Sequence, residues 1–321
     1  MDNKSNSELK RLDDAARAAW LYYVAKNTQD EIAQKLDVSR QSAQRLVALA
    51  VTEGLVKVRL DHPIAQCMAL AQELKEKFAL LNCEVVPSDG VSPNANHGLA
   101  QCGAAILERY LKSDTPKIIA LGTGRALKAC IDELPTMQCP NHKIVSMLGN
   151  MKSDGAASAF DTVVSMANRV NAIHYPMPLP VIASSVQEKK MLHSLQPVKS
   201  ILSLVEQADV TFVGIGQITA SSPLFIDGFI NDDELDVVIT DGAKGEIISW
   251  LYDVNGRLLK NETNKRVVSA PITVNAAKPV YGIAAGEDKV IAILAALRGK
   301  LINSLVTNEY TARALLKLAS K

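Results

Sequence analysis

The sequence lacks the features of membrane-spanning, secreted and zinc-binding proteins. No run approaches the roughly 18 consecutive apolar residues that a membrane helix needs, and the first five residues contain no apolar core of a signal peptide. The five cysteines are widely spaced, odd in number and without a Cys-x-x-Cys pair. Neither a disulfide framework nor a metal site is therefore indicated. We expect a cytoplasmic protein with no metal and no cofactor, whose cysteines are small buried residues.

An excess of charge of one sign is also missing. The 35 Lys and Arg residues are balanced by 34 Asp and Glu residues, which leaves a formal net charge of +1. This balance argues against a broadly basic surface but leaves room for a small basic face that binds DNA. What is present is 48% hydrophobic residues over 321 positions, with only 21% charged residues. The chain can therefore bury a substantial core and has room for two domains.

Residues 1–60 contain three predicted helices in the order of a helix-turn-helix domain. Apolar residues recur at three- and four-residue steps from Leu12 to Tyr23, which predicts the first helix. Thr28 and Glu31 match the capping box that begins a second, short helix. After a turn, Ser39 is a favourable N-cap for a third helix.

The third helix is predicted to end at Gly54 and to be followed by a β-wing over residues 55–59. Two short helices joined by a tight turn match a motif whose second helix enters the major groove of DNA. Arginine can bond bidentately to guanine and glutamine to adenine, while hydroxyls at helix starts hold phosphates. We therefore predict DNA contacts from Thr28, Gln29, Ser39, Arg40, Gln41, Ser42, Gln44, Arg45 and Lys57. A three-helix packing module with a solvated polar face is the alternative.

Residues 61–82 are predicted to form an amphipathic connecting helix. Pro63 breaks the direction of the chain, and apolar residues then recur at steps of three and four from Ile64 to Leu81. Such a helix could couple two domains and pair with a second copy, because palindromic operators call for a dimeric reader. It could equally pack on its own sensor domain.

Residues 83–321 are assigned to a single effector-binding and oligomerisation domain. Short β-rich runs alternate there with helical segments, which predicts an α/β fold with a largely parallel sheet. In such sheets ligands bind beyond the carboxyl ends of the strands, where helix N-termini offer free N–H groups. The predicted strands cover residues 84–86, 117–121, 143–148, 210–214 and 280–284.

Among the predicted strand ends, the segment Gly122-Thr123-Gly124-Arg125 has the clearest pattern of a ligand-binding turn. Its glycines allow the backbone to approach a ligand, while the threonine offers a hydroxyl and the arginine a positive charge. A purely structural β-to-α turn is the alternative. Small residues also lie beside polar ones at residues 148–150, 213–216 and 240–246, where a rim of loops would converge.

Lys289 follows another predicted strand-to-helix turn, within the first turn of the helix. A lysine there conflicts with the positive end of the helix dipole. An anionic or polyhydroxyl ligand nearby would remove the conflict. The alternative is a lysine that extends into solvent.

The order of these motifs resembles that of the SorC family of transcriptional regulators, including its sugar-binding branch named for the DeoR of bacilli. The resemblance covers nearly the whole chain. The matching segments are residues 28–33 with Val38-Ser39-Arg40, then 120–125, 208–216, 241–247, 281–289, 297–299 and 305–312. Two positions depart from the family pattern: Ala285 replaces a usual glycine and Asn308 a usual aspartate.

The resemblance implies an N-terminal winged helix-turn-helix and a Rossmann-like α/β effector domain. That domain would be similar to glucosamine-6-phosphate deaminase and ribose-5-phosphate isomerase, with a sugar or sugar phosphate bound at the strand ends. A homotetramer, a dimer of dimers, on operator DNA is also implied. By motif and by strand-end position, the candidate effector residues are Gly122, Thr123, Gly124, Arg125, Gly149, Asn150, Asp161, Gly216, Glu246 and Lys289.

The leading hypothesis is a DNA-binding regulator of a sugar or polyol catabolic operon, controlled by a sugar or sugar-phosphate effector. It requires no covalent chemistry and no membrane. A sugar-phosphate isomerase or deaminase with an N-terminal helical extension is the competing hypothesis. It would need a general acid and base, for which Asp241 and Glu246 could serve, because the histidines are scattered. In a third hypothesis the sensor domain is only an oligomerisation scaffold.

Overall fold

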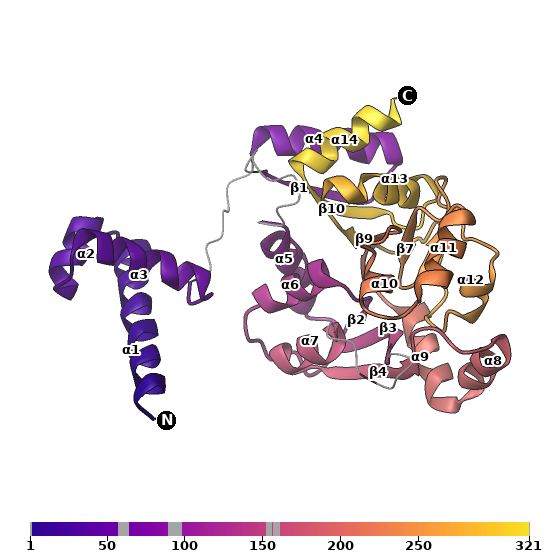
Figure 1. Cartoon of the computed structure of the whole chain (residues 1–321), viewed down its shortest axis with the longest axis horizontal. Helices are drawn as coiled ribbons and strands as arrows, with labels where there is room; N and C mark the ends of the chain where they lie inside the picture. Colours follow the sequence, from indigo (N-terminus) through magenta and orange to yellow (C-terminus); the bar gives the residue numbers. More distant parts are fainter. Residues whose placement is uncertain (1, 57–63, 89–97, 152–155, 157–160, 321) are drawn as a thin grey trace. The chain divides into compact units, whose positions relative to one another are not determined.

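A computed structural model of the chain divides into two compact units, residues 1–62 and 63–321 (Figure 1). The structure describes residues 2–56, 64–88, 98–151, 156 and 161–320. Each unit has hydrophobic clusters of its own. Among the described residues, no helix combines the length and the apolar character that crossing a membrane requires.

The first unit consists of helices, of which those after Thr28 and Ser39 begin at the predicted caps. They are α1 (Asp2–Ala19), continued by the π-helical segment η1 (Trp20–Val24), α2 (Gln29–Leu36) and α3 (Arg40–Thr52). The Thr28 hydroxyl accepts the Glu31 amide, and the Glu31 carboxylate accepts the Thr28 amide at 2.7 Å, which completes the capping box. The Ser39 hydroxyl accepts the Ser42 amide at 3.1 Å. Alanine, isoleucine and valine side chains from all three helices form the core: Ala18, Ile32, Ala43 and Val47.

The turn after α3 begins as the sequence predicts. Gly54 has a φ of +66°, a left-handed conformation that favours glycine and ends the helix. Of the predicted wing over residues 55–59, Leu55 and Val56 form a bend. Lys57 and the rest of the predicted wing lie outside the described residues, so the wing stays a prediction.

The second unit is built on a seven-stranded parallel sheet in the order β1-β10-β9-β5-β2-β3-β4. The predicted α/β class with a largely parallel sheet is confirmed. All five predicted runs form strands, namely β1, β2, β3, β5 and β9. The seven strands are β1 (Asn82–Val86), β2 (Ile118–Leu121), β3 (Lys143–Met151), β4 (Ile173–Pro180), β5 (Val210–Gly214), β9 (Val280–Ile283) and β10 (Ser304–Asn308).

Two strands of the large sheet, β4 and β10, were not predicted from the sequence. The β4 strand contains Pro176, Pro178 and Pro180, which cannot donate backbone hydrogen bonds and therefore argue against a strand in the middle of a sheet. It lies at the edge of the sheet, where such donors are not needed. The β10 strand is short and fully buried between β1 and β9.

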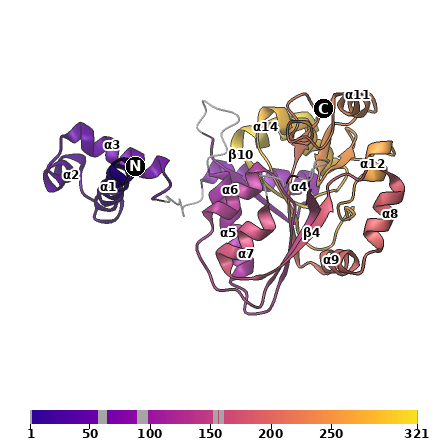
Figure 2. The ribbon, with the colours of Figure 1, turned by 60° about the horizontal axis from the view of Figure 1, so that its bottom comes forward.

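Helices cover both faces of this sheet (Figure 2). One face packs against α5 (Leu99–Leu111), α6 (Arg125–Glu133) and α7 (Thr162–Val170). The other packs against α4 (Ala65–Phe78), α9 (Gln196–Gln207), α13 (Val290–Arg298) and α14 (Glu309–Ala319). Because both faces are covered, strands such as β2 are apolar throughout.

The helix predicted over residues 61–82 is α4. It packs on β1 and α14, with Leu70 and Leu74 buried in the same cluster as Leu315. In this structure α4 therefore belongs to the second unit, as in the alternative of a helix packed on its own sensor domain. Residues 61–63 lie outside the described residues.

A small antiparallel sheet and several short helices complete the second unit. The sheet has the order β6-β7-β8, formed by Gly216–Gln217, Gly245–Ile247 and Trp250–Tyr252. Its neighbours include α10 (Pro223–Ile226) and α11 (Asp232–Thr240), which share a hydrophobic cluster with it. The remaining short elements are α8 (Val186–Ser194), α12 (Glu262–Arg266) and the 3-10 turn η2 (Glu287–Lys289).

Candidate effector site

A pocket lies beyond the carboxyl ends of β2 and β5, two neighbouring strands of the large sheet. From β2 the chain continues to β3 and β4 on one side, and then returns to β5, β9 and β10 on the other. The order of the strands therefore reverses between β2 and β5, which is where open α/β sheets bind ligands. The small sheet and the α10 segment supply the opposite wall, and the cavity has a volume of about 90 Å³.

The predicted Gly122–Arg125 turn supplies one side of this pocket. Gly124 has a φ of +123°, a conformation that requires glycine, and it precedes α6 without any side-chain cap. Gly124, Arg125 and Ala126 all line the pocket, so the first turn of α6 presents backbone N–H groups to it. Gly122 itself does not line the pocket; its carbonyl accepts a hydrogen bond from the Thr162 hydroxyl at 2.6 Å.

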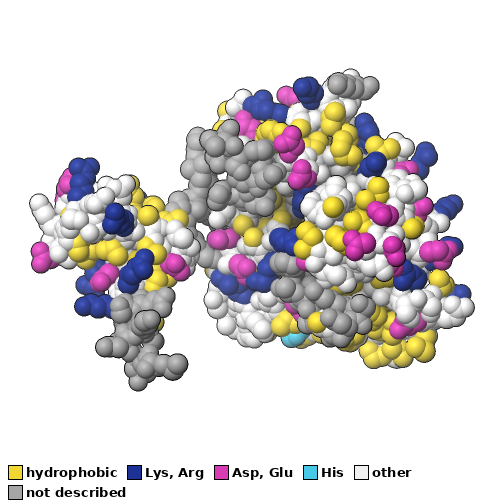
Figure 3. Space-filling view, in the orientation of Figure 1, with side chains coloured by type: hydrophobic (Ala, Val, Ile, Leu, Met, Phe, Trp, Pro, Cys, Tyr) yellow, Lys and Arg dark blue, Asp and Glu magenta, His cyan; other side chains and the backbone are white. Residues whose placement is uncertain are grey.

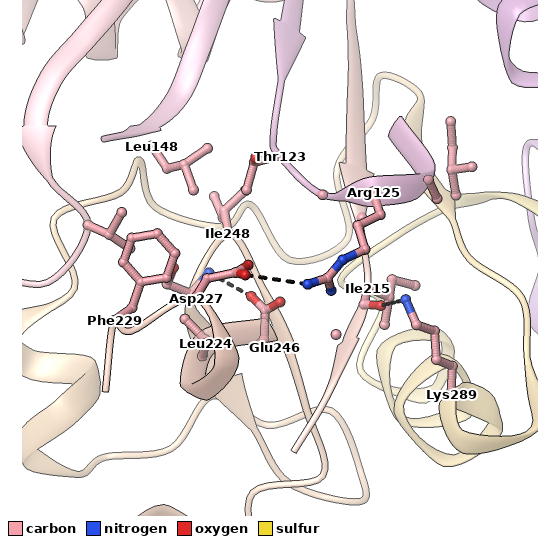
Figure 4. Close-up of a pocket in the computed structure, with 17 residues that line it drawn as sticks. Thr123, Arg125, Leu148, Ile215, Leu224, Asp227, Phe229, Glu246, Ile248 and Lys289 are labelled. Carbon is pink, nitrogen blue, oxygen red and sulfur yellow. Dashed lines mark hydrogen bonds and ion pairs between the residues drawn. The ribbon is translucent and has the colours of Figure 1, made fainter. Parts of the chain in front are cut away.

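The two cations predicted from the sequence both reach the pocket, and each has a partner there (Figure 4). The Arg125 guanidinium lies 3.4 Å from the Asp227 carboxylate. The Lys289 ammonium donates to the Ile215 carbonyl at 3.0 Å. Burial lowers the pKa of Lys289, and the nearby Glu246 opposes that shift. The alternative interpretation of Lys289, a lysine that extends into solvent, is wrong, because its side chain is held against the end of β5.

Glu246 is half-buried on β7, and its carboxylate points into the pocket (Figure 4). One carboxylate oxygen accepts the Ser249 amide at 2.8 Å. Burial raises the pKa of Glu246, and the negative charge of Asp227 adds to the shift, while the Ser249 amide and Lys289 oppose it. The site thus holds two carboxylates close enough to interact.

A smaller hollow adjoins the pocket and shares Thr123, Leu148, Val181 and Phe229 with it. It gathers three further predicted residues, Gly149, Asn150 and Asp161. The Asn150 amide donates to the Asp161 carboxylate at 3.2 Å, and Asp161 also caps α7 by accepting the Val164 amide at 3.1 Å. Gly149 is required by packing, because the Leu179 carbonyl of β4 occupies the place of a β-carbon.

In the first unit, the polar side of α3 faces outward as predicted. Arg40, Gln41, Gln44 and Arg45 are all exposed, while Ala43 and Val47 on the opposite side are buried. Arg40 lies 3.5 Å from Asp30 of α2, and both side chains are about two-thirds exposed, at 68% and 63%. On the face shown in Figure 3, this unit carries Lys and Arg side chains beside Asp and Glu side chains. Of the other predicted DNA contacts, Thr28 and Ser39 are exposed at helix starts, and Gln29 and Ser42 are half-buried.

Residues 62–317 match the family model Sugar-bind, which describes a sugar-binding domain. The chain is 30% identical to the erythritol catabolism regulatory protein EryD of Brucella abortus over 302 residues, which covers 94% of this chain and 96% of that protein. It is also 30% identical to the sorbitol operon regulator of Klebsiella pneumoniae over 311 residues, with 94% and 96% covered. The chain belongs to the SorC/DeoR-type family of sugar-binding transcriptional regulators.

Solved structures of this family have the same fold. The full-length sorbitol operon regulator SorC of Klebsiella pneumoniae superposes with a TM-score of 0.70 and 28% identity, and the match covers 94% of this chain and 97% of that one. A DeoR family regulator from Listeria monocytogenes gives a TM-score of 0.71 at 22% identity, covers 78% of this chain and 99% of that one, and supports the fold alone. The expected fold class, a helix-turn-helix followed by a Rossmann-like effector domain, is confirmed. This SorC-family chain is accordingly a transcriptional regulator.

In this SorC-family protein the sequence-based site residues converge, with one exception. Gly122 lines neither space, whereas the other nine line the pocket or the adjoining hollow. Asp227 and Phe229 were not predicted, because the segment between β6 and β7 offered only an Asp-Gly turn signal and no strand end. Within the described parts of the chain, no cluster of three or more His, Cys, Asp or Glu side chains could hold a metal ion.

Proposed function

We propose that this regulator controls an operon for the catabolism of a sugar or polyol, and that a small effector in the strand-end pocket changes its affinity for operator DNA. The observation that supports this proposal most directly is the composition of the pocket. The pocket brings together side chains and backbone from three distant segments of the chain: the turn after β2, the small sheet and the turn after β9. The residues are Thr123, Arg125, Gly216, Glu246 and Lys289. A pocket with apolar walls and a few convergent polar groups is the usual form of a small-molecule site.

The proposed DNA contacts come from α2, α3 and the segment that follows. The exposed side chains Arg40, Gln41, Gln44 and Arg45 would read base edges, while Thr28 and Ser39 would hold phosphates. Gln29 and Ser42 remain in this proposed set, as does Lys57, which lies outside the described residues. The relatives named above for the regulation of erythritol catabolism and of the sorbitol operon support an operator as the partner.

A second candidate function is the isomerisation or deamination of a sugar phosphate, in which Glu246 would transfer the proton. A half-buried carboxyl with a raised pKa can act as a general acid or base. Against it, none of the described histidines lines the pocket: His142 bonds to the Leu111 carbonyl, His193 to the Val268 carbonyl, and His174 is exposed. We favour binding without catalysis, and unchanged sugar phosphates after long incubation with the protein would agree with this choice.

The proposed assembly is a cytoplasmic homotetramer, a dimer of dimers, on DNA. Proteins that bind palindromic operators are symmetric oligomers, so two copies of the first unit would contact the two half-sites. Apolar side chains on the second unit remain available for such contacts, for example Met68 of α4, which is 57% exposed. Light scattering on the purified protein, with and without operator DNA, measures the number of subunits.

The decisive experiment is a thermal-shift screen of sugars, polyols and their phosphates, followed by operator-binding titrations with each hit. A ligand that binds the folded state raises the melting temperature by mass action. Lys289→Ala should weaken the response to the hit roughly tenfold or more, because a charged hydrogen-bond donor is lost from the pocket. It should leave operator binding without effector unchanged. Lys317→Ala, at an exposed position on α14, is the matched control.

Two results would count against the proposal. An effector that shifts the melting temperature equally in wild type and Lys289→Ala would not be bound in this pocket. A chain that binds operator DNA identically with and without every hit would support the hypothesis of a sensor domain that is only an oligomerisation scaffold.

A further inference from the structure

We infer that the effector is an uncharged polyhydroxyl compound, a free sugar or polyol, and not its phosphate ester. This inference rests on the proposed function and narrows the class of ligand that the pocket accepts. It starts from the ionisable side chains among the described residues that line the pocket. These are two cations, Arg125 and Lys289, and two carboxylates, Asp227 and Glu246, so their formal charges sum to zero.

Both cations are already engaged within the protein. The Arg125 guanidinium faces the Asp227 carboxylate at 3.4 Å, and the Lys289 ammonium donates to the Ile215 carbonyl with Glu246 nearby. A phosphate monoester carries a charge of about −1.5 to −2 at neutral pH. It would have to compete with Asp227 for the arginine and with Glu246 for the lysine.

The two carboxylates also disfavour an anion directly. Asp227 and Glu246 line the same pocket, and the charge of Asp227 adds to the rise that burial causes in the pKa of Glu246, so the two carboxylates repel each other and would each repel an anionic ligand. The adjoining hollow adds a third carboxylate, Asp161, and no Lys or Arg among its described lining residues. The described lining of the pocket and the adjoining hollow together therefore contains three carboxylates and two cations.

The same groups can form hydrogen bonds with the hydroxyl groups of a ligand. A hydroxyl both donates and accepts hydrogen bonds. Asp227 and Glu246 can accept from it, while Arg125, Lys289 and the backbone N–H groups at the start of α6 can donate to it. Between these polar groups lie apolar side chains that can cover the carbon skeleton of a sugar or polyol: Leu148, Leu224, Phe229 and Ile248 (Figure 4).

The test compares uncharged compounds with their own phosphate esters on the full-length protein. Calorimetric titrations use D-sorbitol and D-sorbitol 6-phosphate, erythritol and erythritol 4-phosphate, 2-deoxy-D-ribose and its 5-phosphate, and inorganic phosphate. We expect at least one uncharged compound to bind about tenfold or more tightly than its ester. Inorganic phosphate at millimolar concentration should produce neither heat nor a thermal shift in the wild type.

Asp227→Asn then tests the role of charge. It removes the carboxylate that faces Arg125 while keeping the size of the side chain. Affinity for inorganic phosphate and for the esters should rise about tenfold, and affinity for the uncharged compound should fall. Asp132→Asn is the matched control, because its carboxylate pairs with Lys128 on the same helix at 2.5 Å but does not line the pocket. It should change neither affinity.

The failures of the two proposals are distinguishable. If an ester binds the wild type more tightly than its uncharged parent and changes operator binding, the proposed function stands and this inference is overturned. An Asp227→Asn variant that folds normally but gains no affinity for phosphate also contradicts the inference. If no compound binds and operator affinity never changes, the proposed function fails and the inference fails with it.

Discussion

Gly216 and Glu246 are directly opposed residues of β6 and β7, and the Glu246 carboxylate lies where a β-carbon on residue 216 would have to be. The glycine therefore allows the carboxylate to turn toward the pocket and to accept the Ser249 amide. One small residue thus sets the orientation of the acidic group that we propose to contact the effector.

Gly216→Ala should displace the Glu246 side chain and reduce effector affinity about tenfold or more, with a loss of stability of about 1–3 kcal/mol from overpacking. Thermal unfolding and effector titrations measure the two effects. The same substitution in a Glu246→Ala background removes the clash, so its cost in stability should be smaller there. Equal costs in both backgrounds would show that the two residues are not coupled.

The raised pKa of Glu246 predicts a pH dependence of stability with a definite sign. Because burial raises the pKa of the folded carboxyl above its ordinary value of 4.5, the folded state holds this proton more tightly than the unfolded state. This contribution to the free energy of unfolding is present below pH 4.5 and is lost as the pH rises through the folded pKa.

Glu246→Gln removes that titration. The melting temperature of the variant relative to wild type should therefore increase as the pH rises from about 4.5, and become constant above the folded pKa. Glu206→Gln, at an exposed position on α9, serves as the control. A constant difference between variant and wild type across this range would mean that Glu246 does not titrate as the structure indicates.

Replacing Arg40 and Arg45 with alanine should abolish specific operator binding and leave the thermal stability of the protein nearly unchanged. Both side chains are exposed, and an exposed ion pair such as that of Arg40 with Asp30 contributes about 0–1 kcal/mol. Fluorescence anisotropy with promoter DNA at several salt concentrations measures binding. Arg17→Ala, at an exposed position of α1, should retain specific binding. A large loss of stability in the double variant would indicate a structural role instead.

Ser39→Ala should destabilise the first unit by about 1 kcal/mol, because the Ser42 amide at the start of α3 loses its acceptor. Ser39→Asp retains an N-cap acceptor and should retain stability, yet its negative charge should weaken DNA binding. Circular dichroism melts and anisotropy titrations separate the two effects. If Ser39→Asp binds DNA as well as the wild type, Ser39 does not lie near a phosphate.

The strand ends show how far the candidate site could be predicted. The Gly122–Arg125 turn and Lys289 are flanked by apolar runs and helix formers, so their positions followed from local pattern. Asp227 was missed because it lies in a short segment without a strand end, although its carboxylate faces Arg125 at 3.4 Å. Gly122 does not line the pocket and instead accepts a hydrogen bond from Thr162, because a glycine at a strand end can face either a ligand or the packing of the protein, and the local pattern does not distinguish the two.

The sequence by itself determined the local elements of this protein. Capping boxes, left-handed glycines and hydrophobic periods act over three to eight residues, and they specified the helices of the first unit, five strands of the parallel sheet and the turns at their ends. Only the tertiary structure decided which strand lies beside which, and therefore which side chains share the pocket. The pairing of Arg125 with Asp227 and of Gly216 with Glu246 depends on contacts between distant segments, whose energies no local pattern contains.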